Sequence, residues 1–275
     1  MPQAVQSLPY VAWVLLTAVA LGSFLFVTLT RVRTDATPGY LGFTAFCSGL
    51  VALLALLTDL GLTTPTDLII RTAPIDLVTL RQWALALFAA VALLYPFIAR
   101  GPRATLVMTL AGLAAAAVAL AAAAFGWAPS AVDAVPLLVQ LAMLSLVTGG
   151  SLAAVVLGHW YLVTPKISDK PLVLQARVLM ALIGLQLLLF IVWTTLGGGP
   201  GQGAFDAFSG GNLLLVVLRL LVSLLFPLVL CWMAWRTALT RSMESATGLL
   251  YINLAAVMAG TIGAAALYMS GGLLL

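Results

Sequence analysis

The chain has 275 residues, of which 63% are hydrophobic and 7% are charged, and its formal net charge is +4. Soluble domains contain roughly 45–50% apolar and about 25% charged residues, so this composition excludes an ordinary water-soluble protein. The basic residues lie mostly in short connections between apolar segments, which argues against a nucleic-acid partner. We therefore predict an integral membrane protein whose principal surroundings are the lipid bilayer.

Eight apolar segments follow one another along the chain, each long enough to cross a bilayer as a helix of about 20 residues. In hydrocarbon each segment must satisfy its own backbone amides, which requires helices. The segments do not alternate apolar and polar residues, as the strands of a transmembrane barrel do. We expect one all-α, polytopic bundle spanning residues 1–275, with no soluble domain. The predicted helices cover residues 8–30, 39–61, 77–98, 104–127, 137–163, 172–195, 212–235 and 246–271.

Basic residues occur in alternate connections. They follow the first, third, fifth and seventh predicted helices, whereas the other connections hold Arg71 together with Asp67, Asp76, Asp133 and Asp206. The positive-inside rule then places the basic connections in the cytoplasm and both termini on the outer, periplasmic side of a bacterial-type inner membrane. The residues that carry this topology are Arg31, Arg33, Arg100, Arg103, Lys166, Lys170, Arg236 and Arg241.

A short sequence similarity relates the first and fifth predicted helices. Gly22-Ser23 and Gly150-Ser151 are each followed by a basic connection that contains a proline. A duplication of four helices would produce this pattern, because helices one and five would share an orientation. Two matched dipeptides also arise by chance, so a 4+4 arrangement stays one of two alternatives.

The fifth predicted helix carries the longest series of polar side chains. Ser145, Thr148 and Ser151 fall within about 80° of His159 around the helix axis, and Gln140 within about 100°. Polar groups inside a membrane are costly and are the first places to look for function. We expect this stripe to face the interior of the bundle, with His159 near the cytoplasmic end.

His159 is the only histidine in the chain, and it is followed by Trp160 and Tyr161. An imidazole titrates near neutrality and can donate a hydrogen bond to a quinone carbonyl. Lys166 and Arg177 lie on the same side of the membrane and would add positive potential, so the three residues His159, Lys166 and Arg177 form the predicted quinone-binding site. The alternatives are that His159 belongs to an interfacial aromatic belt and that Arg177 extends to lipid phosphate.

A second charged group lies near the opposite face. Asp59 closes the second predicted helix, Arg81 lies just inside the third, and Arg219 lies about two turns into the seventh. A charge that deep is expensive unless it is paired. We expect Arg219 to pair with Asp59 first, and with Asp76 or Asp206 next. A structural ion pair joining three helices and a second ligand site both remain open.

Several cofactors are not expected. One histidine cannot ligate a bis-histidine haem, and Cys47 and Cys231 stand alone in different helices without a C-x-x-C motif. No nucleotide-binding, hydrolase or zinc-protease motif is present in the sequence. We expect no covalent or metal cofactor, but bound lipids and a quinone or quinol.

Eight helices, both termini outside, short connections and no haem ligands resemble the polysulfide-reductase (NrfD-type) membrane subunits. The resemblance covers the architecture of the whole chain, and it matches no specific motif or functional residue. It implies a cofactor-free subunit of a respiratory or other electron-transfer complex that anchors membrane and extrinsic partner subunits and contacts quinone, without catalysis by the chain alone. A non-catalytic scaffold and a small-solute or ion transporter are the alternatives. Against the transporter, Gly and Pro do not visibly break any span at its midplane.

Overall fold

The computed structural model describes residues 2–275 except 64–67, 165–166, 200 and 210–211. Within the described residues, eight helical spans are long and apolar enough to cross a membrane, and no strand is found. The predicted all-α polytopic fold is confirmed. The helices are α1 (Pro2–Arg33), α2 (Pro38–Leu60), α3 (Ile75–Ile98), α4 (Pro102–Trp127), α5 (Ala131–Val163), α6 (Lys170–Leu196), η1 (Asp206–Phe208), α7 (Leu213–Leu220), η3 (Leu221–Leu225), α8 (Phe226–Leu239) and α9 (Met243–Gly271).

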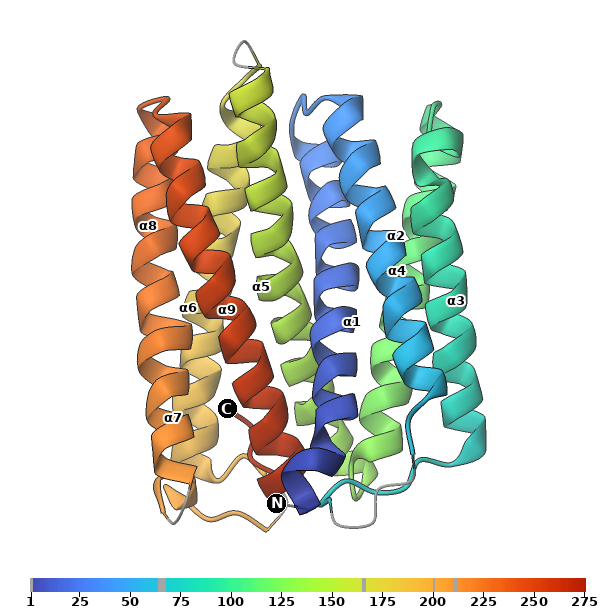
Figure 1. Ribbon diagram of the computed structural model, residues 1–275, viewed down its shortest axis with the longest axis vertical. Coiled ribbons are helices and arrows are strands. Elements are labelled where there is room, and N and C mark those ends of the chain that lie inside the picture. The colour runs from blue at the N-terminus through green and yellow to red at the C-terminus, as the bar shows by residue number, and fades with distance from the viewer. Residues whose placement is uncertain (1, 64–67, 165–166, 200, 210–211) are drawn as a thin grey trace.

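The seventh span is not a uniform α-helix. Its first part, α7, passes through the π-helical turn η3 into α8, so that three segments form one continuous rod (Figure 1). A π-helical turn leaves the normal i→i−4 bonding pattern, and such turns occur frequently at functional sites. The turn begins two residues after Arg219.

Both ends of the chain lie toward one end of the bundle, which we call the terminal end (Figure 1). The opposite end, where α1, α3, α5 and α8 finish, is called the basic end. Its helix ends and connections carry Arg31, Arg33, Arg100, Arg103 and Arg241.

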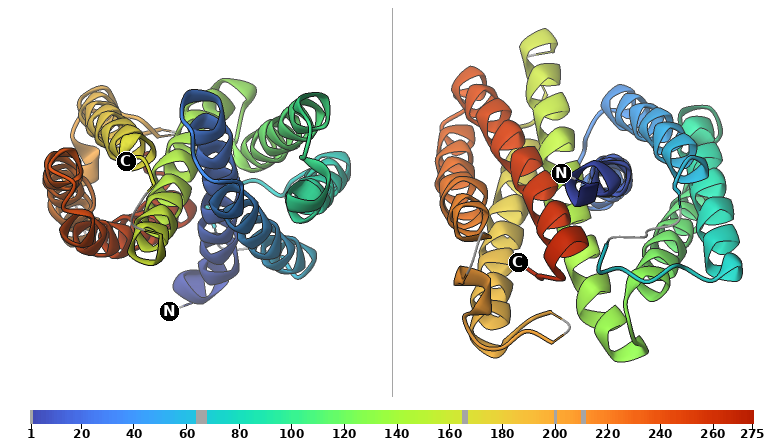
Figure 2. Two further views of the ribbon diagram at one scale, coloured as in Figure 1. Left: turned by 90° about the horizontal axis from the view of Figure 1, so that it is seen from above. Right: turned by 60° about the horizontal axis from the view of Figure 1, so that its bottom comes forward.

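The spans form two groups, α1–α4 and α5–α9, which lie side by side when the bundle is viewed from its end (Figure 2). Helices α1 and α5 lie between the groups and are 78% buried over their most apolar stretches, against 44% or less for the other spans. They pack on each other, while α1 also contacts α9 and α5 contacts α4. This exchange of neighbours is what two related halves would produce.

Helices α1 and α5 are in backbone contact where they cross. A Cβ added to Gly22 would lie 1.7 Å from the carbonyl oxygen of Ser145, and one added to Gly149 would lie 2.3 Å from the amide nitrogen of Ser23. The ring of Phe26 covers Gly150 in the same way. Small residues permit such close approach between membrane helices. The Gly22-Ser23 dipeptide of α1 therefore packs directly against the backbone of Ser145 and Gly149 on α5.

Two further pairs of motifs occupy corresponding places in the halves. Residues 58–61 (TDLG) and 194–197 (TTLG) end α2 and α6, and residues 77–81 (LVTLR) and 215–219 (LVVLR) lie in α3 and α7. Arg81 and Arg219 are each the seventh residue of their helix. Together with the helix contacts, these repeats support the 4+4 arrangement.

Candidate functional site

A buried ion pair joins α2 to α3 near the terminal end. Arg81 Nε lies 2.6 Å from Asp59 Oδ2, and Arg81 Nη2 lies 3.2 Å from Oδ1. Gln82 donates a third hydrogen bond to Asp59 Oδ1 at 3.1 Å. Asp59 and Arg81 are each only 2% exposed. This two-point geometry is the strong form of an arginine–carboxylate interaction.

The same guanidinium lies against two indole rings that are in contact with each other. The Arg81 Cζ atom is 5.4 Å from the centre of the Trp13 ring and 5.0 Å from that of Trp127. The two indoles are in edge contact, with 4.9 Å between their centroids. A desolvated cation over an indole face is further stabilised. Since Trp13 lies on α1 and Trp127 on α4, the ion pair and its rings connect all four helices of the first half.

The expected pairing of Arg219 with Asp59 is wrong. Asp59 is bonded to Arg81, whereas Arg219 lies in the second half, where its Nε donates to the backbone oxygen of Leu275 at 3.3 Å. Among the residues that the structure describes, no carboxylate side chain, including those of Asp76 and Asp206, forms an ion pair with it. The physical reason is the order of the helices in space: α7 packs against the second half and not against α2.

The repeated motifs explain the difference between the two arginines. In the TxLG motif the first half has Asp59, and the second half has Thr195 at the matching position. Thr195 is exposed, and its hydroxyl bonds within its own helix to the carbonyls of Ile191 and Val192. Arg219 is nevertheless only 2% exposed. The second half therefore buries the cation without a matching aspartate.

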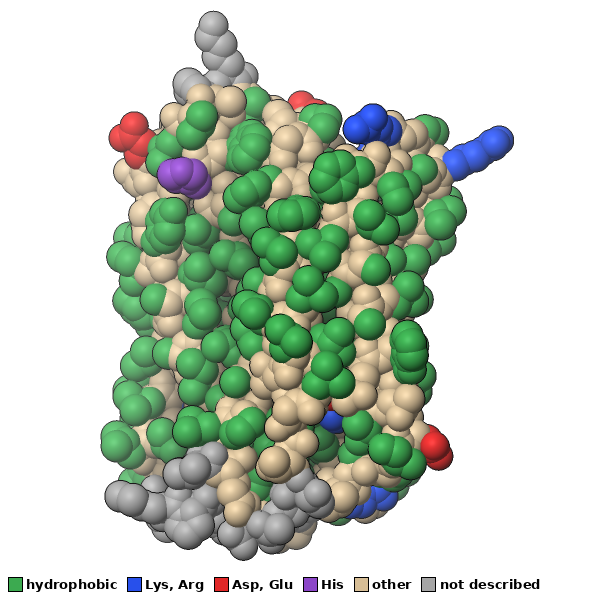
Figure 3. Space-filling model, turned by 45° about the vertical axis from the view of Figure 1, so that its right-hand side comes forward, with side chains coloured by type: hydrophobic (Ala, Val, Ile, Leu, Met, Phe, Trp, Pro, Cys, Tyr) green, Lys and Arg blue, Asp and Glu red, His purple; other side chains and the backbone are tan. Residues whose placement is uncertain are grey.

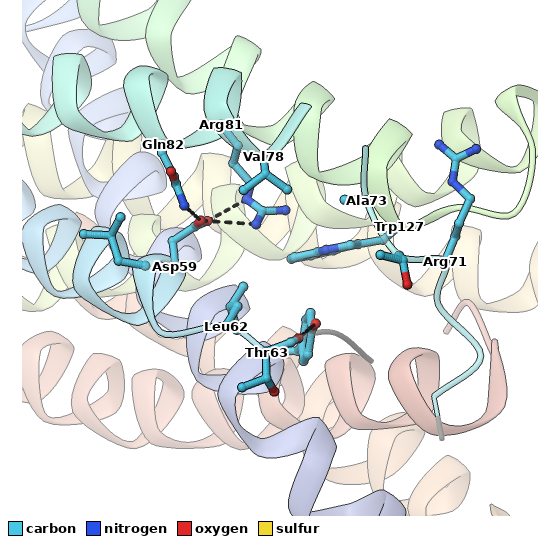
Figure 4. Close-up of a pocket in the computed structure, with 12 residues that line it drawn as sticks. Asp59, Leu62, Thr63, Arg71, Ala73, Val78, Arg81, Gln82 and Trp127 are labelled. Atoms are coloured by element: carbon cyan, nitrogen blue, oxygen red, sulfur yellow. Dashed lines mark hydrogen bonds and ion pairs between the residues drawn. The ribbon is translucent and has the colours of Figure 1, made fainter. Parts of the chain in front are cut away.

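A small polar pocket borders the Arg81–Asp59 pair (Figure 4). It has a volume of about 170 Å³ and is formed by α1, α2, α3, the α2–α3 connection and the end of α4. We call it the Arg81 pocket. Its polar lining consists of Tyr10, Asp59, Thr63, Arg71, Thr72, Arg81 and Gln82.

A second, apolar site surrounds His159 near the basic end. It is a groove of about 440 Å³ on the outer surface of the bundle, between α2, α5 and α9, and we call it the His159 groove. Figure 3 shows the histidine near one end of a face that is otherwise largely hydrophobic. Besides His159, the groove is lined by Phe43, Leu152, Val155, Val156, Trp160, Val163, Thr164, Tyr251 and Leu254.

The polar stripe of α5 is confirmed only in part. Gln140, Ser145, Thr148 and Ser151 are buried, as expected, but His159 is exposed. Its neighbour Gly158 faces the interior instead, where a Cβ would lie 2.6 Å from the hydroxyl oxygen of Thr247 on α9. Thr148, about three turns earlier on the same side of α5, is buried, so the exposure of His159 follows from its place near the helix end and not from its angle around the axis.

The predicted partners of His159 are distributed differently from the expectation. Trp160 lines the same groove as His159, with its ring centre 6.2 Å from that of Phe43. Arg177 is exposed and lies over the ring of Trp235 on α8, 5.3 Å from its centre, outside the groove. Lys166 lies outside the described residues. No Lys, Arg, Asp or Glu among the described residues lines the groove.

Two buried hydrogen-bond networks were not anticipated from the sequence. Gln175 on α6 donates to Thr30 and to Tyr40 at 2.6 and 2.8 Å, and Tyr40 donates to the carbonyl of Ala153. Asn253 on α9 donates to Ser151 at 2.9 Å. An amide side chain within an apolar span was the signal available for both, because a buried amide requires partners in other helices.

Comparison of the chain with protein-family models, with curated proteins and with solved structures gave no significant match. Among the described residues, no group of three or more His, Cys, Asp or Glu side chains could hold a metal ion. The two sites and the architecture of the bundle are therefore the only basis for inferring a function.

Proposed function

We propose that the chain is a membrane subunit of an electron-transfer complex that contacts quinone or quinol in the His159 groove. The observation that carries the proposal is the position of the one histidine, exposed in an apolar groove at the end of a membrane-spanning helix. Small-molecule sites are typically apolar cavities of about 300–1,000 Å³ with a few polar groups that fix orientation. The groove has these properties.

The lining of the groove suits a flat, lipid-soluble ring. Phe43, Trp160 and Tyr251 offer aromatic surface, and the aliphatic residues of α5 and α9 extend the groove along the bundle. In this proposal a quinone ring lies against the aromatic side chains, and its tail follows the aliphatic surface in the lipid. His159 donates a hydrogen bond to a ring carbonyl and exchanges a proton with the water beyond the helix end.

The architectural resemblance to NrfD-type subunits supports the remaining part of the proposal. Partner subunits hold the redox centre that exchanges electrons with the quinone, and this chain anchors them in the membrane. The positive-inside rule supports a cytoplasmic position for the basic end and hence for the His159 groove. We infer a bacterial-type inner membrane on the same basis.

Quinone binding to the purified chain in lipid nanodiscs tests the proposal. Quinones quench tryptophan fluorescence, and Trp160 lies beside the expected ring position. In a decylubiquinone titration, His159→Ala should raise Kd by roughly threefold to tenfold, since one hydrogen bond contributes about 0.5–1.5 kcal/mol. Trp235→Phe, at the unrelated Arg177 contact, is the matched control and should bind normally. A folded His159→Ala protein with an unchanged Kd would return His159 to the aromatic belt and favour the scaffold function.

A second candidate function, transport of a small solute, is supported by the seventh span. Its π-helical turn begins two residues beyond the buried Arg219, inside the second of two related four-helix halves. Irregular helices within such repeats are typical of transport sites. In a variant without Cys47 and Cys231, a cysteine at Ser223 should then react with a membrane-impermeant reagent from each side of the membrane. Reaction from one side only, or from neither, would contradict transport.

A further inference from the structure

The Arg81 pocket borders a buried donor that has no acceptor. Asp59 accepts hydrogen bonds from Nε and Nη2, which form one edge of the Arg81 guanidinium. The remaining nitrogen, Nη1, is buried and has no hydrogen-bond partner among the described residues. A guanidinium carries five N–H donors in a fixed plane, so Nη1 projects away from the carboxylate. A buried N–H without an acceptor is destabilising, more so on a charged group.

The space beside this donor is large enough for an organic ligand. The pocket volume of about 170 Å³ compares with the engineered cavity of about 150 Å³ that holds benzene. Its walls combine the polar groups of Arg81 and Gln82 with the apolar surfaces of Val78 and Trp127. A ligand that fits both surfaces has one polar group and a single ring or short carbon chain.

The charges around the pocket select the sign of that polar group. Among the described residues that line the pocket, Arg71 and Arg81 contribute two positive charges and Asp59 one negative charge, an excess of one positive charge. Arg71 is held at the border of the pocket by a hydrogen bond of 2.9 Å from its Nη2 to the carbonyl of Phe125. Figure 4 shows it on the far side of Trp127 from the ion pair, where it adds potential without direct contact. A monoanion balances this arrangement.

We propose that the Arg81 pocket binds a small monocarboxylate. One carboxylate oxygen accepts a hydrogen bond from Arg81 Nη1, and the carbon skeleton lies against Val78 and Trp127. The ligand enters from the terminal end, which the positive-inside rule places outside the cytoplasm. This site is at the opposite end of the bundle from the His159 groove and does not depend on quinone binding.

Sodium benzoate and its neutral isostere benzamide test the proposal on the full chain in nanodiscs. Benzoate should bind saturably by calorimetry and raise the unfolding temperature as its concentration rises. Benzamide should bind at least about tenfold more weakly, because it offers no charge to the charged donor. The absence of saturable benzoate binding would mean that the pocket holds water only. Equal binding of the two compounds would exclude recognition of an anion. Either result overturns the proposal.

Substitutions then test whether benzoate binds in the Arg81 pocket. Arg81→Gln removes the donor but leaves Asp59 buried and unpaired, so it risks unfolding the protein. Val78→Phe fills the pocket and leaves the ion pair intact, and it should weaken benzoate binding by at least about tenfold. Arg103→Gln removes an exposed arginine at the basic end and should leave binding unchanged. Normal binding by folded Val78→Phe, or equal loss in Arg103→Gln, would assign the anion to another site and overturn the proposal.

Discussion

At the scale of single residues, the two buried arginines occupy matching positions in the repeat but are satisfied differently. Arg81 has Asp59 and two indole rings, and Gln82 donates to the same carboxylate. Arg219 donates to a backbone oxygen, and a Cβ at Gly260 would lie 2.8 Å from its Nη1 and 2.3 Å from the Cβ of Ser223. Without a carboxylate at the matching position, this arginine relies on a backbone acceptor, and its Nη2 has no hydrogen-bond partner among the described residues.

The Arg81–Asp59 pair should show strong energetic coupling. Arg81→Gln leaves a buried carboxylate uncompensated and should lower the free energy of unfolding by about 3–5 kcal/mol. Adding Asp59→Asn removes that charge, so the double variant should be more stable than the sum of the single effects predicts. A double-mutant cycle, measured by denaturant unfolding in mixed micelles, gives the coupling energy directly.

A second double-mutant cycle, between Arg219 and Asp59, distinguishes the observed pairing from the one expected from the sequence. Arg219 forms no hydrogen bond or ion pair with Asp59 and lies in the other half. The effects of Arg219→Gln and Asp59→Asn should therefore add within about 0.5 kcal/mol. A large coupling energy between these two substitutions would contradict the arrangement of helices described above.

At the scale of helices, the sequence predicts where the spans lie but not which of them touch. Hydropathy marks the part of a helix in hydrocarbon, so the predicted start at residue 137 falls inside α5, which begins at Ala131 after the Ser130 cap. The neighbours of each helix depend on packing between faces that are nearly all apolar. For this reason neither the Asp59–Arg81 pair nor the outward position of His159 followed from periodicity. The repeated LVxLR motif was a readable signal for the relation between Arg81 and Arg219.

The glycines at the crossing of α1 and α5 should be essential for packing of the two halves. Gly149→Val would place a side chain where the backbone of α1 lies, 2.3 Å from a Cβ position. It should lower the unfolding temperature sharply or prevent recovery of folded protein, as overpacking costs at least about 1–3 kcal/mol. Thermal unfolding in mild detergent measures the effect.

Gly263 on α9 provides the matched control for this substitution. A Cβ at Gly263 meets nothing within 4 Å. Gly263→Ala should therefore be neutral or stabilising, by up to about 1 kcal/mol, because alanine favours the helix. If Gly149→Val were tolerated as well as Gly263→Ala, the close contact between α1 and α5 would not hold the halves together.

At the scale of the whole molecule, the two ends of the bundle differ in chemistry. The basic end has the apolar His159 groove, open to the surrounding lipid, and the terminal end has the polar Arg81 pocket within the first half. Helices α1 and α5 separate the halves along the full length of the bundle. Ligands at the two sites would therefore approach from different phases, one from lipid and one from water.

The orientation of the bundle decides which compartment each end faces, and labelling of single cysteines measures it. With Cys47 and Cys231 replaced, a cysteine at Gln202 lies in the connection between α6 and α7 at the terminal end, and one at Ser168 lies between α5 and α6 at the basic end. The alternation of basic connections predicts that a membrane-impermeant maleimide added to intact cells labels the first and not the second. Permeabilised cells should label both, which controls for reactivity. Labelling of Ser168→Cys alone in intact cells would invert the topology, moving the His159 groove to the outer face and the Arg81 pocket to the cytoplasm.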